Sequence, residues 1–466
     1  MTLCLIGSRS RRAAAFSLWC TCALVAQAGN LLAQEVIIGD QSGSGAVVSD
    51  GTIGPMTSED GMSYGGYGGY SGCDCNGGYD GGCDNYMTCD QCDAYDDAAG
   101  HSRCSGWFGA EYLRWRLDGS NRLPPLVTAG PAGSPTAGLL NDPDTIILSG
   151  DETVGNDWRD GYRINGGFWL DCCHTCGIGA DYFDVGSDDY NFTSPQDPSI
   201  ITGRPFYNAE LNEDDLELVS VPNELDGTAN VRANDEFQGA GITVNRSLWR
   251  CCDPCCGNSA GVSALGGYRY YKYDSNLTIT ENLTVLPGTS TPLVPGTTFY
   301  VQDRFRTENQ FNGGDLGLQA YKLRQWWWLD GMAKVALGNN RRTVRVSGQT
   351  EIDVPGGGTA SAAGGLLTSD VTNIGVYQDN DFVVIPEFRL GVGVKVTKCV
   401  SVRGGYNCII WSDVARAGDH LPPGLEVDPR NLPPVQGGGG PEPEFPGITG
   451  SQLVAHGLDA SVMVQW

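Results

Sequence analysis

Cysteine thiols have the widest chemical range of any side chains in this 466-residue chain. The stretch 89–92 reads Cys-Asp-Gln-Cys, which is the spacing of a redox pair or of half a zinc site. The stretch 251–256 reads Cys-Cys-Asp-Pro-Cys-Cys and offers four thiolates, but adjacent cysteines constrain the tetrahedral geometry of zinc poorly. Local disulfides or free thiols are therefore the favoured interpretation. We expect no metal and no cofactor.

Histidine, the commonest general acid or base, is scarce. The four histidines are His101, His174, His420 and His456, and none lies beside a recognisable nucleophile or acid motif. We therefore expect that the protein is not an enzyme and has no catalytic residues.

The last eleven residues alternate between apolar and mostly polar side chains, as a strand with two different faces does. A tilted strand of about this length crosses a bilayer in a closed barrel, and the chain ends on an aromatic residue, as outer-membrane barrels usually do. An edge strand of a soluble sandwich also alternates, so the pattern must recur upstream. The expected lipid-facing side chains of this strand are Leu458, Ala460, Val462, Val464 and Trp466.

The same alternation recurs in nine upstream segments. With the last one, the predicted strands span 106–117, 160–171, 177–186, 236–249, 260–273, 309–322, 326–338, 383–396, 400–412 and 453–466. Loops of roughly forty residues alternate with connections of about three to ten residues, which is the pattern of long extracellular loops and short periplasmic turns. A Greek-key sandwich has no reason to alternate so regularly. We predict an all-β, transmembrane, antiparallel up-and-down β-barrel of about ten strands, with twelve as the alternative.

The N-terminal part predicts export. Residues 1–28 contain three arginines, a short apolar run and an Ala-Gln-Ala site, the layout of a cleaved signal peptide, with cleavage after residue 33 as an alternative. Residues 29–105 form a Gly-, Tyr- and Cys-rich extension with too few aliphatic residues for a core, so we expect it to be largely disordered. Residues 106–466 are assigned to the barrel. The net charge of -26 argues against nucleic acid as a partner.

Several motifs in the barrel region resemble a known family. They are Ala-Glu-Tyr-Leu-Arg-Trp at 110–115, Leu-Pro-Pro-Leu-Val-Thr at 123–128, Asp-Thr-Ile-Ile-Leu-Ser-Gly at 144–150, Gly-Gly-Phe-Trp-Leu-Asp at 166–171 and Ile-Thr-Gly-Arg-Pro-Phe at 201–206. From about residue 107 onward the chain resembles the β-barrel porin-7 family of bacterial outer-membrane proteins. The resemblance implies a barrel in the outer membrane and a porin, and it brings no catalytic residues.

In such a barrel, the polar face of each strand lines the bore. The expected lumen charges are Asp181, Arg269, Asp315, Asp330, Lys334, Glu387, Arg389, Lys395 and Arg403. Porin constrictions use charges of both signs to orient solutes, although the same residues could pair with one another and fill the bore. Ten strands lie nearer to barrels with packed interiors than to open pores.

Two functions remain open at this stage. We favour a narrow porin for small solutes or ions, mainly because the family resemblance points there. The alternative is a non-conducting structural or surface protein that acts through its long loops. The expected partners are outer-membrane lipid, the barrel-assembly machinery and, for a porin, small solutes or ions; an oligomer is compatible with the sequence. Tryptophans 107, 158, 326, 327, 328, 411 and 466 suit interfacial girdles, although single tryptophans are as often packing residues.

Overall fold

The fold is described from a computed structural model, which describes residues 106–119, 122–171, 174–253, 258–288, 293–434 and 437–466. The expected signal peptide and Cys-rich extension lie outside these described residues. Within the described ranges, no helix is both long and apolar enough to cross a membrane.

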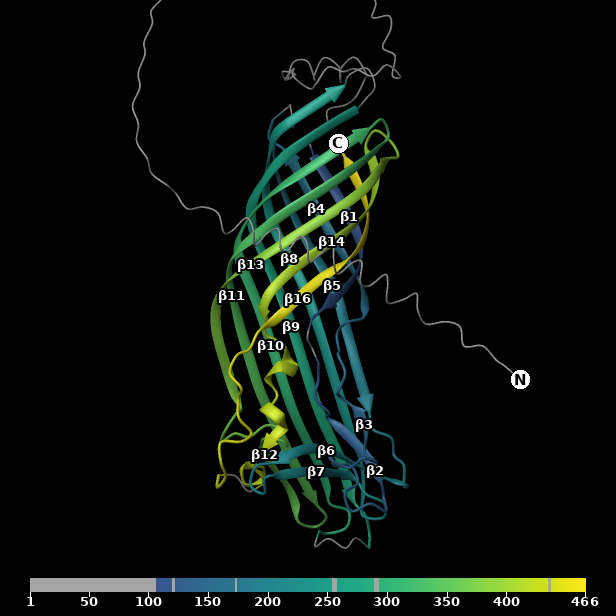
Figure 1. Ribbon diagram of the computed structural model, residues 1–466, viewed down its shortest axis with the longest axis vertical. Coiled ribbons are helices and arrows are strands. Elements are labelled where there is room, and N and C mark those ends of the chain that lie inside the picture. Colours follow the sequence, from purple (N-terminus) through teal and green to yellow (C-terminus); the bar gives the residue numbers. More distant parts are fainter. Residues whose placement is uncertain (1–105, 120–121, 172–173, 254–257, 289–292, 435–436) are drawn as a thin grey trace, which may run out of the picture. The chain divides into compact units, whose positions relative to one another are not determined.

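Ten antiparallel strands form a closed ring (Figure 1). Each strand pairs with its neighbour in the ring, and the first strand pairs with the last over twelve residue pairs. In ring order the strands are β1 (Gly106–Asp118), β4 (Trp158–Trp169), β5 (Cys176–Thr193), β8 (Leu225–Asp253), β9 (Asn258–Val285), β10 (Thr298–Arg324), β11 (Trp327–Val354), β13 (Gly375–Lys395), β14 (Val400–Val414) and β16 (Ser451–Gln465). The prediction of an antiparallel barrel of about ten strands is confirmed.

Four of these strands are much longer than predicted. Strands β8 to β11 have 27 to 29 residues each, more than twice the length that crosses a bilayer. Figure 1 shows them running the full height of the barrel, while β1, β4, β14 and β16 occupy only one half of it. The predicted ends of β8 to β11 are therefore wrong on the side of the long connections, where much of the expected loop is strand.

The physical reason lies in what the extended halves face. In β9, Leu277, Ile279 and Leu283 point inward and are buried, whereas Thr278 and Thr280 point outward. The alternation of period two continues beyond the membrane, but its outer face is polar instead of apolar. The alternation of apolar and polar side chains that predicts a membrane strand stops at the edge of the lipid, whereas the hydrogen-bonded strand continues beyond it.

The outer face of β10 shows where the lipid-facing band lies. Leu316 and Leu318 are more than half exposed, and they are followed by Lys322 and Arg324 toward the short-turn end. Toward the other end, the outward side chains become Asn312, Gln310 and Glu308. Exposed apolar side chains are stable on a barrel surface only where lipid replaces water. The short turns and both ends of the ring's chain lie on one side of this band, and the strand extensions lie on the other.

The terminal strand fits the same band. The outward side chains Leu458, Val462, Val464 and Trp466 are 58%, 49%, 41% and 57% exposed, and Ala460 between them is exposed as well. On the inner face, Gly457, Asp459 and Ser461 are buried. One strand therefore separates an apolar exterior from a polar interior.

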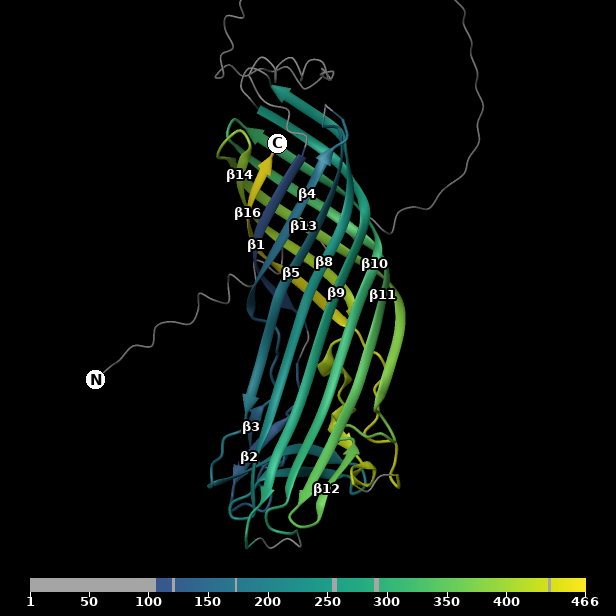
Figure 2. The same ribbon diagram turned by 180° about the vertical axis from the view of Figure 1, so that it is seen from behind.

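A second, smaller sheet packs at the extended end (Figure 2). Its strands are β2 (Val127–Pro131), β3 (Ile146–Ser149), β6 (Ile200–Asn208), β7 (Glu213–Ser220) and β15 (Glu426–Val427). The 3-10 turns η1 (Ala417–His420), η2 (Pro423–Leu425) and η3 (Pro429–Asn431) lie between β14 and β16, and β12 (Gly358–Ala363) pairs with β11. Buried apolar residues of this sheet and of the long strands form one core. The long connections are thus folded against the strand extensions.

We predict that Val462→Lys destabilises the barrel by about 2–4 kcal/mol, because Val462 lies near the middle of the lipid-facing part of β16. The measurement is urea unfolding in lipid vesicles. The matched control is Gln452→Lys, on the same strand and the same outer face but beyond the apolar band, where the change should be small. Equal losses at the two positions would contradict a lipid-facing Val462.

Candidate functional site

The bore contains a layer of charged side chains at the level of the lipid-facing band. Eight of the nine expected lumen charges take part in ion pairs there, and Lys395 lies exposed at the rim near the short turns. They meet because alternate positions of a strand share a face and adjacent strands place those faces side by side. The ion pairs form two chains.

The first chain begins at Arg163 and crosses from β4 to β11. Glu111 accepts from Arg163 at 3.1 Å and from Arg389 at 2.8 Å. Arg389 also lies 3.9 Å from Asp459, which pairs with Arg403. Arg403 then contacts Asp330 at 2.9 Å, and the indole N–H of Trp328 donates to the same carboxylate at 3.0 Å.

The second chain runs along the opposite part of the ring, from β5 to β13. Asp181 receives two hydrogen bonds from Arg269, at 2.7 and 3.0 Å. Asp315 lies between Arg269 at 3.5 Å and Lys334 at 3.4 Å. Lys334 pairs with Glu387 at 3.0 Å, and Tyr271 donates its hydroxyl to that carboxylate at 2.9 Å. Signs alternate along both chains, so each buried charge has a partner of opposite sign.

Sequence reasoning missed three members of this layer: Glu111, Arg163 and Asp459. All three are buried, and they connect residues that were expected in the lumen. The sequence signal that could have identified them is their position in the alternation of inward and outward side chains along each strand. Asp459 alternates with the apolar face of the last strand, and Glu111 with Ala110 and Tyr112, so each occupies an inward position.

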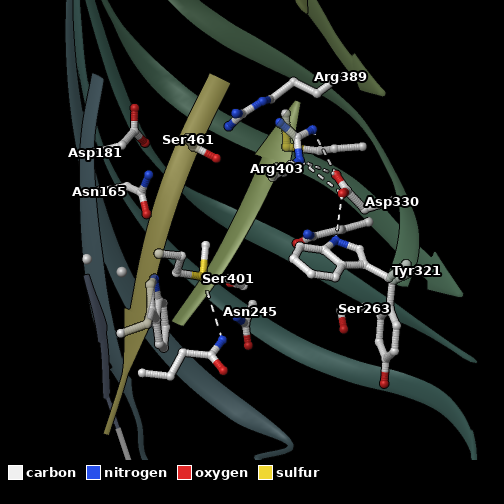
Figure 3. A pocket seen from close by; sticks show the side chains of 18 of the residues that line it. Asn165, Asp181, Asn245, Ser263, Tyr321, Asp330, Arg389, Ser401, Arg403 and Ser461 are labelled. Atoms are coloured by element: carbon white, nitrogen blue, oxygen red, sulfur yellow. Dashed lines mark hydrogen bonds and ion pairs between the residues drawn. The ribbon is translucent and has the colours of Figure 1, made fainter. Parts of the chain in front are cut away.

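A cavity of about 580 Å³ lies between this layer and the short-turn end of the barrel. Figure 3 shows its polar walls, with Arg389, Arg403 and Asp330 on one side and Asn165 and Asp181 on the other. We call it the cup. Nearer its mouth the lining combines aromatic and polar side chains, Trp107, Trp169, Trp328, Tyr321, Asn245, Ser263 and Gln465, with the cations Arg250, Lys395 and Lys398. The cup is a mixed-charge vestibule at the short-turn end of the barrel.

Beyond the charged layer, an aromatic layer fills the bore. It contains six side chains that are at most 1% exposed: Trp115, Phe183, Phe237, Tyr271, Phe311 and Trp411. They come from six different strands of the ring, and Trp411 lies 6.0 to 6.4 Å, centroid to centroid, from Phe237, Tyr271 and Phe311. Packing of this kind leaves no room for a continuous column of water.

The aromatic layer corrects the expectation of interfacial girdles for three tryptophans. Trp411 is fully buried in the layer, and Trp107 and Trp328 line the cup. Trp158, Trp326 and Trp466 are exposed on the outside, where a girdle needs them. The error has a simple cause: a tryptophan fits a lipid interface and a packed interior equally well by composition, and only the register assigns the face.

A buried ionic cluster holds the small sheet against the strand extensions. Arg204 of β6 donates to Glu281 at 2.5 Å and to Asp303 at 2.8 Å, and all three side chains are at most 1% exposed. Glu217 of β7 lies opposite Arg204 in the strand register. Burial, with repulsion from the nearby Glu281, raises the pKa of Glu217 to about 7. Two carboxylates thus share one guanidinium, with the carboxyl of Glu217 nearby.

Two described histidines, His420 and His456, are hydrogen-bonded to neighbouring groups. His456 Nε2 lies 2.8 Å from Asp118, and its Nδ1 lies 2.7 Å from the Tyr406 hydroxyl. His420 Nδ1 donates to the Arg416 carbonyl at 2.7 Å, and burial lowers the pKa of its imidazole. Among the residues that the structure describes, no three His, Cys, Asp or Glu side chains are arranged to hold a metal ion. Much of the 251–256 cysteine stretch lies outside them.

The family model described as "Putative beta barrel porin-7" matches residues 107–466, which is the ring and its connections. The chain belongs to this family. It is an outer-membrane β-barrel protein, and outer-membrane lipid surrounds its apolar band. A search of curated proteins finds no significant match.

The chain is also similar in fold to solved outer-membrane barrels at low sequence identity. The outer membrane protease OmpT from Escherichia coli is 10% identical with a TM-score of 0.35, covering 78% of this chain and 98% of that one. The P. putida toluene transporter TodX is 8% identical with a TM-score of 0.17, covering 78% and 89%. A Pseudomonas aeruginosa FadL homologue is 8% identical with a TM-score of 0.18, covering 78% and 90%. Similarity at this level assigns no activity.

We predict that Arg389→Ala lowers the free energy of unfolding by about 3–5 kcal/mol, because it leaves Glu111 and Asp459 short of a cation inside the barrel. Guanidinium unfolding measures the loss. Arg389→Lys keeps the charge and should lose less, and Lys322→Ala on the exposed outer face should lose little. A loss for Arg389→Ala no larger than for Lys322→Ala would show that the charged layer does not stabilise the barrel.

We predict that Glu217 makes the stability of the extended end depend on pH. Since its pKa in the folded protein is about 7 and the ordinary value is 4.5, the folded protein retains a proton that the unfolded chain releases between these values. Stability should therefore fall as pH rises from 4.5 to 7, by up to roughly 3 kcal/mol from this group. Glu217→Gln should flatten the dependence between pH 5 and pH 8 in unfolding measurements. An unchanged slope in this variant would assign the pH dependence to other groups.

Proposed function

We propose that this protein is a closed-bore outer-membrane barrel that works through the part extending beyond the outer leaflet. The observation that carries the proposal is the aromatic layer, in which Trp115, Phe237 and Trp411 are buried without residual exposure. A solute passing from the cup to the far end would have to displace several packed aromatic side chains. Truncating even one such side chain in a core costs about 3–5 kcal/mol, so displacing several is a large barrier to conduction.

The strand extensions support the second half of the proposal. Strands β8 to β11 continue well past the lipid-facing band, and the small sheet packs inside this extension around its own apolar core. A rigid, hydrogen-bonded surface outside the membrane is suited to contacts with neighbouring molecules.

A narrow porin for small solutes or ions is the second candidate. Family membership favours it, and so does the cup, whose walls carry charges of both signs as porin constrictions do. In this version the aromatic layer is a gate that must rearrange for conduction. The two candidates differ in one measurable quantity, the conductance of the folded protein.

Other expectations from the sequence remain proposals. We propose a non-enzymatic role, and the engaged nitrogens of His420 and His456 are consistent with structural histidines. We also propose that the barrel-assembly machinery inserts the chain, with the aromatic-ended β16 as its signal. The closed ring leaves no strand edge that requires a second copy, so a monomer is the simplest assembly.

We predict that the purified full-length protein shows no single-channel steps in a planar bilayer, with small ions or with small neutral solutes. The double variant Phe237→Ala/Trp411→Ala should open a measurable leak if it still folds, because it removes two rings from the layer that blocks the bore. Tyr321→Ala is the control, since it widens the cup without touching the aromatic layer.

Heat-modifiable migration on gels would establish folding of each variant before conductance is recorded. Regular, ion-selective steps from the unmodified protein would overturn the closed-bore proposal and support the narrow porin. Silence from the unmodified protein together with a leak from the double variant would support the seal.

A further inference from the structure

An arginine-rich surface covers the outer face of the long strands beyond the lipid-facing band. We call it the arginine wall. Its five members come from three strands. Four of them are exposed, and Arg306 is partly buried. The five are Arg232 of β8, Arg304 and Arg306 of β10, and Arg341 and Arg345 of β11.

The strand register brings these side chains together. Arg306 lies directly opposite Arg345, and Arg304 is two residues from Arg306 on the same face of β10. Arg232 shares a row with Arg304, separated only by Thr278 of β9. Side chains directly opposite on antiparallel strands have Cβ atoms about 5 Å apart, and like charges in that position destabilise a sheet. A pair such as Arg306 and Arg345 therefore needs an anion.

The described protein does not supply that anion. In the ranges that the structure describes, none of the five arginines has a carboxylate within the 4.0 Å of an ion pair. On the next row, Asp274 pairs with Lys272 at 2.6 Å and Glu308 accepts a hydrogen bond from the Gln310 amide, while the exposed Glu236 lies more than 4.0 Å from each of the five arginines.

Outward arginines of β1 are paired, whereas Arg246, Lys322 and Arg324 on the outer face at the short-turn end have no carboxylate within 4.0 Å among the described residues. On β1, Arg114 pairs with Asp160 at 2.7 Å and Arg116 with Asp118 at 2.6 Å. The chain as a whole has a net charge of -26, so carboxylates are abundant. What distinguishes the arginine wall is that Arg306 and Arg345 lie directly opposite each other, without a carboxylate partner in the described part of the chain, in so acidic a protein.

The position of the wall indicates the kind of anion. The lipid-facing band of β11 ends near Leu337, and Arg341 and Arg345 lie four and eight residues beyond it on the same face. At about 3.4 Å per residue and a strand tilt of about 35–45°, Arg345 lies roughly 19–22 Å above Leu337 along the membrane normal. The headgroup region of an ordinary phospholipid layer is only about 5–8 Å thick. A phospholipid could reach Arg341, whereas Arg345 and Arg304 require a headgroup that continues outward for several sugar units.

We propose that the arginine wall binds an anionic glycolipid of the outer leaflet. Its acyl chains would lie against the apolar side chains around Leu316, Leu337 and Tyr268, and its phosphate or carboxylate groups would bridge the arginines above them. Guanidinium groups suit this role, because they bind phosphate and carboxylate through two parallel hydrogen bonds. The proposal holds whether or not the bore conducts.

The test measures binding of defined lipids to the full-length folded protein in neutral detergent, for example by native mass spectrometry. The probes are a phosphorylated lipopolysaccharide that retains its inner sugars, the same molecule after enzymatic dephosphorylation, and phosphatidylglycerol. The test variant is Arg304→Gln/Arg306→Gln/Arg345→Gln. The matched control is Arg246→Gln/Lys322→Gln/Arg324→Gln, which removes three cations from the outer face of the same strands at the opposite, short-turn end.

We expect the phosphorylated glycolipid to bind the unmodified protein and the control equally. The test variant should bind it at least about tenfold more weakly, as the loss of charge-assisted hydrogen bonds predicts. Replacement of the same three arginines by lysine should restore part of the affinity.

Three outcomes would overturn the proposal. They are equal binding by the test variant and the unmodified protein, equal binding of the dephosphorylated molecule, and equal binding of phosphatidylglycerol. None of these outcomes would change the conductance of the protein. The glycolipid proposal and the closed-bore proposal can therefore be overturned independently of each other.

Discussion

Closure of the hydrogen-bonded ring is the constraint on which the rest of the structure depends. In lipid, a backbone N–H or C=O without a partner costs several kcal/mol, so a sheet can cross a membrane only if it has no free edge. Pairing of β1 with β16 removes the last edge. Once the ring is closed, every strand has an inner and an outer face. The environment of each residue then follows from which face it occupies and from its position along the barrel axis.

The inner face solves a problem that closure creates. Ten strands enclose a space too narrow for a wide aqueous channel and too wide to be left empty. The protein fills it with stacked layers of different chemistry: a cup, two chains of paired charges, an aromatic layer, and the apolar core of the extended end. The ionic chains are compatible with burial because signs alternate along them, and the aromatic layer separates them from the other end of the barrel.

The outer face is divided by height in the same way. Apolar side chains occupy the lipid-facing band, and polar ones begin where the long strands leave it. Because β8 to β11 remain paired beyond the membrane, their outer face becomes an extended, rigid surface close to the outer leaflet. Unpaired arginines on that surface lie where the headgroups and sugars of a neighbouring lipid would be, which links the architecture of the long strands to an interaction in the plane of the membrane.

The sequence by itself determined the fold class, the number of strands and the alternation of short and long connections, because side-chain alternation of period two is a local property of a strand. It also identified eight residues of the ionic layer, since a charge on the polar face of a membrane strand has no other place to go. It did not find Glu111, Arg163 and Asp459, although their parity marks them as inward. Their importance arises from neighbours more than fifty residues away.

Only the tertiary structure decided the length of the strands, the packing of the aromatic layer and the arginine wall. The strand extensions have a polar outer face, so local apolarity no longer reports them. Trp411 could be a girdle residue or a plug by type, and the ring register alone places it in the bore. Arg232, Arg306 and Arg345 are scattered over more than a hundred residues of sequence, and pairing of β8 to β11 brings them to one face. These features depend on contacts between distant strands, which no local pattern in the chain encodes.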